Sequence, residues 1–329
     1  MLNHPPASTA SRRRFLTGTA VSAATLSLGT HVGLSDAAEA KVTTGNETVR
    51  DRLWLFACPA NSDFPAMQRR SVMTPVEGAY YMGIPNLMVV QASEREAPFG
   101  RFEPPFAQYA VAMRPLKRVV WSIVGSGGFH SPEETEEVME LAKTMDNFAG
   151  IMLDDFFTNG IPGRRARLKV EELAEIRRRL KTIDDKRDIC VTLYTDDVGL
   201  PIDDYLELVD VITLWNMSPD AIRDLEENLR QCEEKAPRKR IMLGCYVVDY
   251  GRKRGMPVDL MKRQCEMGLK WLRQGRIQGI IFLGNTTLDM DFPAVEWTRK
   301  WISEVGDEGL IAPTDAGSRD SAAAKTKAP

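Results

Sequence analysis

The chain has 329 residues, of which 43% are hydrophobic and 27% are charged. Its 43 basic and 46 acidic side chains give a formal net charge of −3 at pH 7. The length is sufficient for a large domain with a sizeable core. The acidic balance argues against a nucleic-acid-binding protein, which needs a basic face.

The first 40 residues have the pattern of a targeting signal rather than of a folded segment. Three arginines at 12–14 precede Phe-Leu, a mildly apolar stretch follows at 17–34, and Ala-Glu-Ala stands at 38–40. This order resembles a twin-arginine export signal that is cleaved after residue 40. The resemblance implies a periplasmic or secreted protein. The apolar stretch is short and interrupted by glycine, so no stable membrane insertion is expected after cleavage.

Beyond the signal, eight apolar runs alternate with helical patterns. Parallel strands that are buried on both faces read as continuous apolar runs, and crossover helices join them. Eight such units over about 250 residues are typical of one (β/α)8 barrel. The sequence therefore predicts an α/β fold, a single (β/α)8 TIM barrel over residues 41–305. The eight predicted strands lie at 53–58, 86–91, 118–125, 150–157, 188–197, 209–216, 240–249 and 279–285.

Helix signals separate these runs. Ser131 followed by Pro132 is a typical helix N-cap and first turn. The Ser-Pro-Asp sequence at 218–220 has the same N-cap pattern. Apolar residues recur at three- and four-residue intervals over 170–183 and 258–273, which predicts outer barrel helices. After the barrel, residues 306–329 lose this periodicity and are predicted to form a disordered tail.

The five cysteines are an odd number for an exported protein. Three of them fall in predicted strands, where a thiol usually behaves as a small buried apolar group. Cys232 and Cys265 fall on helices that follow neighbouring strands. The sequence leaves open a disulfide between these two.

The fourth strand ends in Asp154 and Asp155, which are followed by Phe156 and Phe157. In (β/α)8 barrels the active site lies at the carboxyl ends of the strands. Adjacent side chains alternate along a strand, so we expect one aspartate to point inward and act chemically, and the other to be structural. The two phenylalanines are expected to form an apolar wall that raises a carboxyl pKa toward that of a general acid.

The other strand ends add acids, amides and aromatic rings. Carboxylates across an aromatic-lined cleft suit glycosidic bond cleavage, in which one acid protonates the leaving oxygen and another acts as nucleophile or base. A catalytic pair is predicted from Asp154, Asp155 and Asp249, although Asp249 could instead pair with Arg252 or Lys253. The predicted substrate-binding residues are Trp121, Tyr194, Asp197, Trp215, Asn216, Tyr246, Asn285 and, in the loop after strand two, Glu94.

The segment Gly-Ile-Met-Leu-Asp-Asp-Phe-Phe at 150–157 resembles the fourth strand of glycoside hydrolase-type barrels, including the chitinase-like group. The resemblance implies a glycoside hydrolase with a carbohydrate substrate and no cofactor. One position departs from the pattern, because Phe156 stands where chitinase-like enzymes carry a catalytic glutamate. The resemblance therefore does not extend to substrate-assisted cleavage of N-acetyl sugars.

Two other classes remain open. A non-catalytic glycan-binding barrel would keep the aromatic rings but hold Asp154 and Asp155 in salt bridges. A carboxylate-metal lyase or aldolase, with Ca²⁺ or Mg²⁺, would need three or more carboxylates converging on one point. No lysine at a strand end could form a Schiff base. His130 is the one histidine left after signal cleavage, which argues against histidine-based metal sites, and no metal ligands are predicted.

Overall fold

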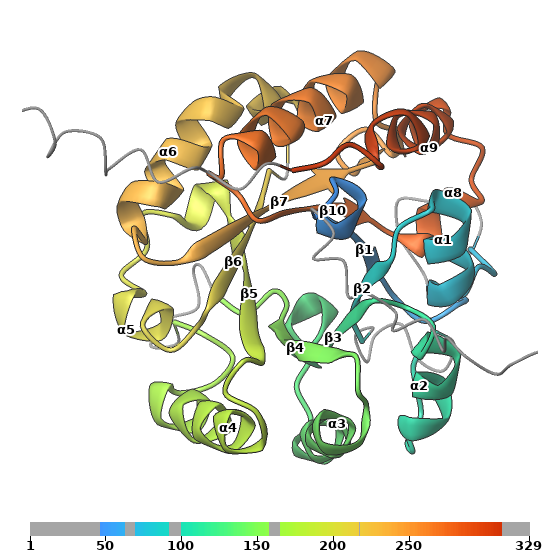
Figure 1. Ribbon diagram of the computed structural model, residues 1–329. Helices are drawn as coiled ribbons and strands as arrows, with labels where there is room; N and C mark the ends of the chain where they lie inside the picture. The colour runs from blue at the N-terminus through green and yellow to red at the C-terminus, as the bar shows by residue number, and fades with distance from the viewer. Residues whose placement is uncertain (1–46, 63–69, 92–99, 158–164, 217, 311–329) are drawn as a thin grey trace, which may run out of the picture. The chain divides into compact units, whose positions relative to one another are not determined.

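The computed structural model of the protein describes residues 47–62, 70–91, 100–157, 165–216 and 218–310. The predicted signal peptide lies outside these residues. Eight parallel strands close into a barrel in the order β1-β10-β7-β6-β5-β4-β3-β2 (Figure 1), which confirms the predicted single (β/α)8 barrel. The barrel strands are β1 (Leu53–Ala57), β2 (Asn86–Val89), β3 (Arg118–Val124), β4 (Phe148–Leu153), β5 (Asp188–Tyr194), β6 (Val211–Trp215), β7 (Arg240–Tyr246) and β10 (Gly279–Leu283).

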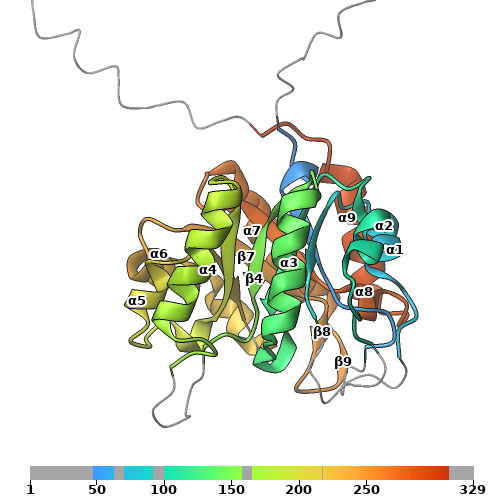
Figure 2. The same ribbon diagram turned by 90° about the horizontal axis from the view of Figure 1, so that it is seen from below.

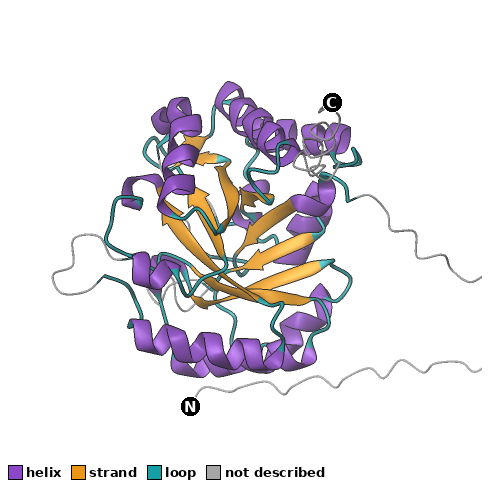
Figure 3. Cartoon of the chain, turned by 60° about the vertical axis from the view of Figure 1, so that its left-hand side comes forward, coloured by secondary structure: helices purple, strands orange, loops and turns teal. Residues whose placement is uncertain are grey.

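Helices surround the strands (Figure 3). The two helices predicted from periodicity at 170–183 and 258–273 are confirmed with the same bounds. The side chain of Ser131 accepts a hydrogen bond from the Glu134 N–H and caps the helix that begins at Pro132, as expected. The helices are α1 (Pro75–Met82), α2 (Ala107–Met113), α3 (Pro132–Thr144), α4 (Val170–Ile183), α5 (Asp203–Leu206), α6 (Leu225–Lys235), α7 (Val258–Arg273), α8 (Asn285–Leu288) and α9 (Pro293–Val305).

The barrel strands are apolar because helices cover their outer face and side chains fill the interior. Every residue of β1, β2, β6 and β10 is buried. Gly244 of β7 shows how tightly the interior is filled, because a Cβ there would lie 2.1 Å from a ring atom of Trp215. A glycine is thus required for the Trp215 indole to lie across β7.

Two strand ends differ from the sequence prediction. Strand β4 ends at Leu153, before both aspartates, and β7 ends at Tyr246. Asp249 therefore lies beyond the seventh barrel strand, in the short strand β8 (Val248–Asp249), which pairs with β9 (Arg254–Gly255). Figure 2 shows this hairpin at one end of the barrel, below the strands.

The last described residues return to the first ones. The N–H of Val49 donates to the carbonyl of Glu308 at 2.9 Å, and the N–H of Leu310 donates to the carbonyl of Glu47 at 2.6 Å. Residues 306–310 of the predicted tail are therefore paired with residues 47–50, and residues 311–329 lie outside the described part.

All five cysteines are buried within the described residues, and none of them forms a disulfide. The bridge between Cys232 and Cys265 that the sequence left open is thus not made. In the described part of the chain, no helix has both the length and the apolar character to cross a membrane.

Candidate active site

The residues that follow β4 directly form a pair of carboxyl groups. Asp154 is 5% exposed, and its carboxyl accepts a hydrogen bond from the Thr192 hydroxyl at 2.8 Å. Asp155 accepts one from the backbone N–H of Gly127 at 2.7 Å and one from the hydroxyl of Tyr194. Thr192 and Tyr194 are two residues apart on β5, so their side chains point to the same side of the sheet. Both carboxyl groups are therefore anchored to neighbouring side chains of one strand.

Backbone conformation explains how adjacent aspartates achieve this. The strand has ended, and Asp155 has a φ of +44°, a left-handed conformation that aspartate and asparagine tolerate better than most residues. The Nε of Arg167 donates to the Asp155 carbonyl at 3.4 Å, and its side chain lies where Gly128 has no Cβ. The turn thus brings the second carboxyl back toward β5, so both aspartates lie against the same strand.

Burial raises the pKa of Asp154 well above its usual 3.8, and the neighbouring Asp155 carboxyl raises it further. The hydrogen bond from Thr192 opposes this shift only in part. A carboxyl with a raised pKa can keep a proton near neutral pH, which is the property of a general acid.

The apolar wall expected from Phe156 and Phe157 lies elsewhere. The Phe156 ring is fully buried and meets the ring of Tyr205, on α5, at 5.6 Å between centroids. It therefore packs on the helical layer. Since β4 ends at Leu153, the alternation along this strand does not carry Phe156 into the barrel mouth.

Tyrosines take the place of that wall. Burial is the main cause that raises the pKa values of Tyr194, Tyr246 and Tyr250, and both Asp154 and Asp155 add to each shift. The rings of Tyr246 and Tyr250 meet edge to face at 5.4 Å. The three phenols therefore lie near the carboxyl pair and stay protonated.

Thr192 and Tyr250 were not among the predicted site residues. Thr192 could have been found, because it lies two residues before Tyr194 on the same strand. Tyr250 lies beyond the hairpin strand β8, where no strand alternation indicates its direction.

Asp249 is ion-paired. Its carboxylate is 1% exposed and lies 3.2 Å from Nη1 of Arg252 and 3.5 Å from Nε of Arg254. It also accepts the Arg252 N–H at 3.1 Å. This is the alternative that the sequence left open for Asp249, and it stabilises the turn between β8 and β9.

Trp121 lies on the outer face of β3, contrary to its predicted place in the cleft. Its indole is fully buried and stacks on Phe106 at 5.3 Å, with Phe102 at 5.4 Å. Both phenylalanines belong to the segment that leads into α2. The prediction failed because Trp121 lies one residue before Ser122, whose hydroxyl accepts the Gln91 N–H, and neighbouring residues face opposite sides.

Trp215 and Asn216 end β6. The Trp215 indole is 2% exposed, lies between Phe56 and Tyr246, and donates to the Thr213 hydroxyl at 3.0 Å. It therefore belongs to the top layer of the barrel core. Asn216 is 3% exposed and accepts from the Asn228 amide at 2.7 Å, while its own Nδ2 has no hydrogen-bond partner within the described residues.

Asn285 is a structural clamp. Its side-chain oxygen accepts the Cys58 N–H at 2.8 Å, and its Nδ2 donates to the carbonyls of Cys58 at 2.9 Å and Met73 at 2.7 Å. Because backbone groups use both polar atoms, Asn285 is not available to bind a sugar hydroxyl, as the sequence had suggested.

The remaining residues singled out from the sequence are Asp197, Glu94 and His130. Asp197 is half-buried in the turn that follows β5, where its carbonyl accepts the Leu200 N–H at 3.0 Å. Glu94 lies outside the described residues. His130 is half-buried, with Nε2 at 3.2 Å from the Thr135 hydroxyl, and burial lowers its pKa.

The described residues contain no group of three His, Cys, Asp or Glu side chains that could hold a metal ion. Within the same residues, no Lys or Arg forms a salt bridge with the side chain of Asp154 or Asp155. The feature expected of a purely glycan-binding barrel is therefore not seen at this carboxyl pair.

Solved structures of known proteins share the barrel fold of this chain. No family model and no curated protein matches the chain. A candidate α-L-fucosidase from Bacteroides thetaiotaomicron VPI-5482 superposes with a TM-score of 0.50 at 11% identity, over 84% of this chain and 99% of that one. Active domain 2 of a thermostable chitinase from Pyrococcus furiosus gives 0.50 at 16% identity, over 79% and 97%. At such identities the likeness shows the shared barrel fold alone.

Proposed function

We propose that this protein is a carbohydrate-active hydrolase that cleaves glycosidic bonds, with Asp154 and Asp155 as its catalytic carboxyl groups. The observation that carries the proposal is the carboxyl pair itself. It lies at the carboxyl end of β4, it is anchored to neutral donors on β5 and to the Gly127 N–H, and the pKa of Asp154 is raised. The fold likeness to a chitinase and to a candidate fucosidase supports the same class.

The two carboxyl groups have different tasks in this proposal. Asp154 keeps its proton and gives it to the glycosidic oxygen as the bond from that oxygen to the anomeric carbon breaks. Asp155 stabilises the positive charge that develops on the sugar ring and then accepts a proton from the attacking water. Water then adds to the anomeric carbon, and its proton returns to the carboxyl pair. Tyr194 orients Asp155 through its hydroxyl.

Asp249 has no catalytic task in the proposal, since Arg252 and Arg254 hold its carboxylate. In the proposal, an adjacent pair that directly follows β4 replaces the predicted acid pair across strands four and seven. Export through the twin-arginine route, with a periplasmic or secreted location, belongs to the proposal as well. It is supported by the arginines at 12–14 and the small residues at 38–40.

The test is reducing-sugar release from a panel that includes α-L-fucosides and chito-oligosaccharides. Asp154→Asn and Asp155→Asn should each lower kcat by about 10²–10⁴-fold. Asp224→Asn is the matched control, because Asp224 is exposed at the start of α6, and it should keep full activity.

Equal activity of the wild type and both strand-four variants would refute the acid pair. Release by none of the proteins, with sugars that still raise the melting temperature of the wild type, would instead establish the glycan-binding barrel.

A further inference from the structure

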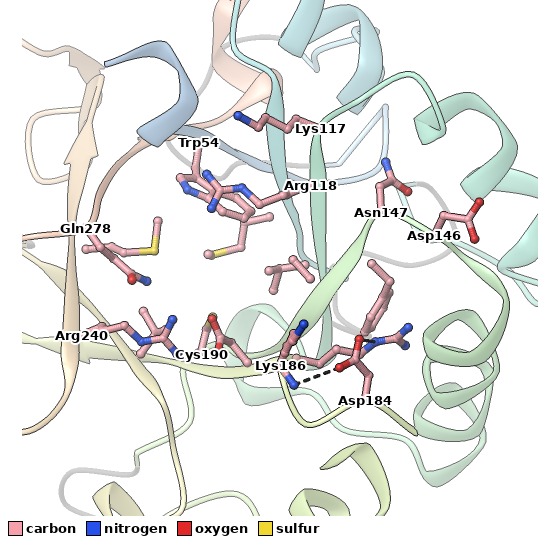
Figure 4. Close-up of a pocket in the computed structure, with 18 residues that line it drawn as sticks. Trp54, Lys117, Arg118, Asp146, Asn147, Asp184, Lys186, Cys190, Arg240 and Gln278 are labelled. Atoms are coloured by element: carbon pink, nitrogen blue, oxygen red, sulfur yellow. Dashed lines mark hydrogen bonds and ion pairs between the residues drawn. The ribbon is translucent and has the colours of Figure 1, made fainter. Parts of the chain in front are cut away.

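The opposite end of the barrel contains a cavity of about 330 Å³. It is lined by residues of the strands β1 to β7 and by the turns that lead into several of them (Figure 4). Its volume is at the lower end of the range for small-molecule sites. We call it the amino-terminal pocket. It is distant from the carboxyl pair, because it lies where the strands begin.

Cations predominate in the wall of the amino-terminal pocket. Its lining includes three acids and five basic side chains, an excess of two positive charges: the acids are Asp146, Asp184 and Asp188, and the bases are Lys117, Arg118, Lys186, Arg187 and Arg240. The whole chain carries a net charge of −3. Asp51, which lies outside the lining, pairs with Lys117 at 2.8 Å, so an excess of one positive charge remains, and such a site on an acidic protein attracts anions.

The acids of the wall do not satisfy all of these cations. Asp188 pairs with Arg240, and Asp184 lies 3.5 Å from Nε of Arg187. Nε and Nη1 of Arg187 are nevertheless buried without a hydrogen-bond partner in the described part of the chain. The ammonium of Lys186 forms no hydrogen bond or ion pair there, and this side chain is exposed at the pocket edge (Figure 4).

Arg118 adds a partly buried cation to the same wall. Its guanidinium lies 4.8 Å above the Trp54 ring, and its Nε donates to the Asn86 side chain at 3.1 Å. Burial and the nearby Arg52 guanidinium lower its pKa. The carboxyl groups of Glu47, Asp51 and Asp188 offset this shift in part.

The floor of the pocket is apolar. Met88, Val120 and Met242 close it toward the barrel interior, and none of them is more than 2% exposed. The Cys190 thiol is also in the floor, where burial raises its pKa, so it stays neutral. A ligand would thus meet apolar atoms below and cationic groups at the rim.

We propose that the amino-terminal pocket binds a small organic anion, in which a compact apolar body carries one carboxylate or phosphate group. The apolar body lies on the methionine floor, and the oxyanion faces Lys186, Arg187 and Arg240. Planar guanidinium groups match oxyanions with paired hydrogen bonds, and lysine adds a flexible charge. This assignment does not depend on the proposed hydrolase activity.

Calorimetric titration of the purified protein tests it, with benzoate, the neutral isostere benzamide and inorganic phosphate as probes. Benzoate should bind at one site with a Kd of about 0.1–1 mM, and benzamide should bind at least tenfold more weakly. Lys186→Gln and Arg240→Gln should each weaken benzoate binding by about fivefold. Raising the salt concentration should weaken it as well. Tighter binding of phosphate than of benzoate would identify a phosphate ester as the ligand class, and the reverse a carboxylate.

Two control variants separate site binding from general charge and from folding. Arg238→Gln removes an exposed arginine that pairs with Glu207 outside the pocket, and it should leave binding unchanged. Ala149→Leu fills the pocket without changing its charge and should abolish binding of every probe. Equal binding of benzoate and benzamide, an equal loss in Arg238→Gln, or full binding by Ala149→Leu would overturn the proposal.

Discussion

Buried or half-buried carboxyl groups at the two ends of the barrel have different neighbours, and their pKa values are shifted in opposite directions. At the amino-terminal end, Asp210 accepts the Ile189 N–H at 3.0 Å and pairs with Arg177 and Lys181. Burial would raise its pKa, but these contacts outweigh burial and lower it. At the carboxyl-terminal end, Asp154 is bonded to the neutral Thr192 hydroxyl, and its pKa rises.

Burial alone therefore does not turn a carboxyl group into a proton donor. Burial raises the pKa of both carboxyl groups, and only the one that is held by neutral donors beside a second carboxyl keeps a raised pKa. Asp249 shows that position at the rim is not sufficient either, since it is buried but held by two arginines. The chemistry of the carboxyl pair therefore depends on which neighbours contact it, and the following predictions test that dependence.

The largest effect on stability should come from a rim residue that has no chemical task. Asn285→Ala removes three hydrogen bonds that the side chain makes to backbone groups of Cys58 and Met73. The free energy of unfolding should fall by about 3 kcal/mol. Urea denaturation measures this loss. A loss below about 0.5 kcal/mol would show that the clamp is dispensable.

Removing the phenol that contacts Asp155 should affect activity rather than folding. Tyr194→Phe deletes a hydrogen bond to a carboxylate, which should lower kcat about tenfold. Its KM and melting temperature should change little, since the ring remains. The pH profile of kcat should also shift, because the proton balance of the pair changes. An unchanged kcat and pH profile would confine Tyr194 to a packing role.

Asp154→Asn should stabilise the protein at neutral pH while it removes activity. The folded-state pKa of Asp154 lies above its unfolded value, so the folded protein holds the proton more tightly, and stability falls as pH rises above about 4. The amide cannot ionise, so the variant should melt about 2–4 °C higher at pH 8. The gain should vanish below pH 4. Asp155→Asn serves as the comparison, and an equal gain there would contradict the special environment of Asp154.

The smallest effect should be found at the amino-terminal pocket. Lys186 is exposed and forms no ion pair within the described residues, so Lys186→Gln should change the free energy of unfolding by less than about 0.5 kcal/mol. Thermal melts at low and high salt measure the effect. A clear rise in stability at low salt alone would indicate that repulsion among the pocket cations is felt in the folded state.

The barrel could be predicted because its signal is repeated and one-dimensional. Each buried strand produces an apolar run, and α4 and α7 follow the period of an amphipathic helix. Asp154, Asp155 and Tyr194 were chosen as candidates for the same reason, since each closes a run, and the structure brings them together. Strand ends were harder to place, because the sequence does not show where β4 stops and the left-handed turn at Asp155 begins.

The wrong predictions at the site concern the direction of a side chain or its hydrogen-bond partners. Trp121 was assigned to the interior, although it is one residue out of phase with Ser122. Asn285 was read as a ligand for hydroxyls because its backbone partners are far away in the sequence. The cations of the amino-terminal pocket precede different strands, and only the closed barrel brings them together.

The clamp at Asn285 also constrains the order in which the chain folds. It joins residues that are 227 positions apart, at the seam where β1 pairs with β10. Closing so long a loop is entropically costly, and contacts of high sequence separation form slowly. A growing chain therefore cannot complete the barrel during synthesis until β10 has been made, and until then β1 lacks the neighbour on one of its two edges.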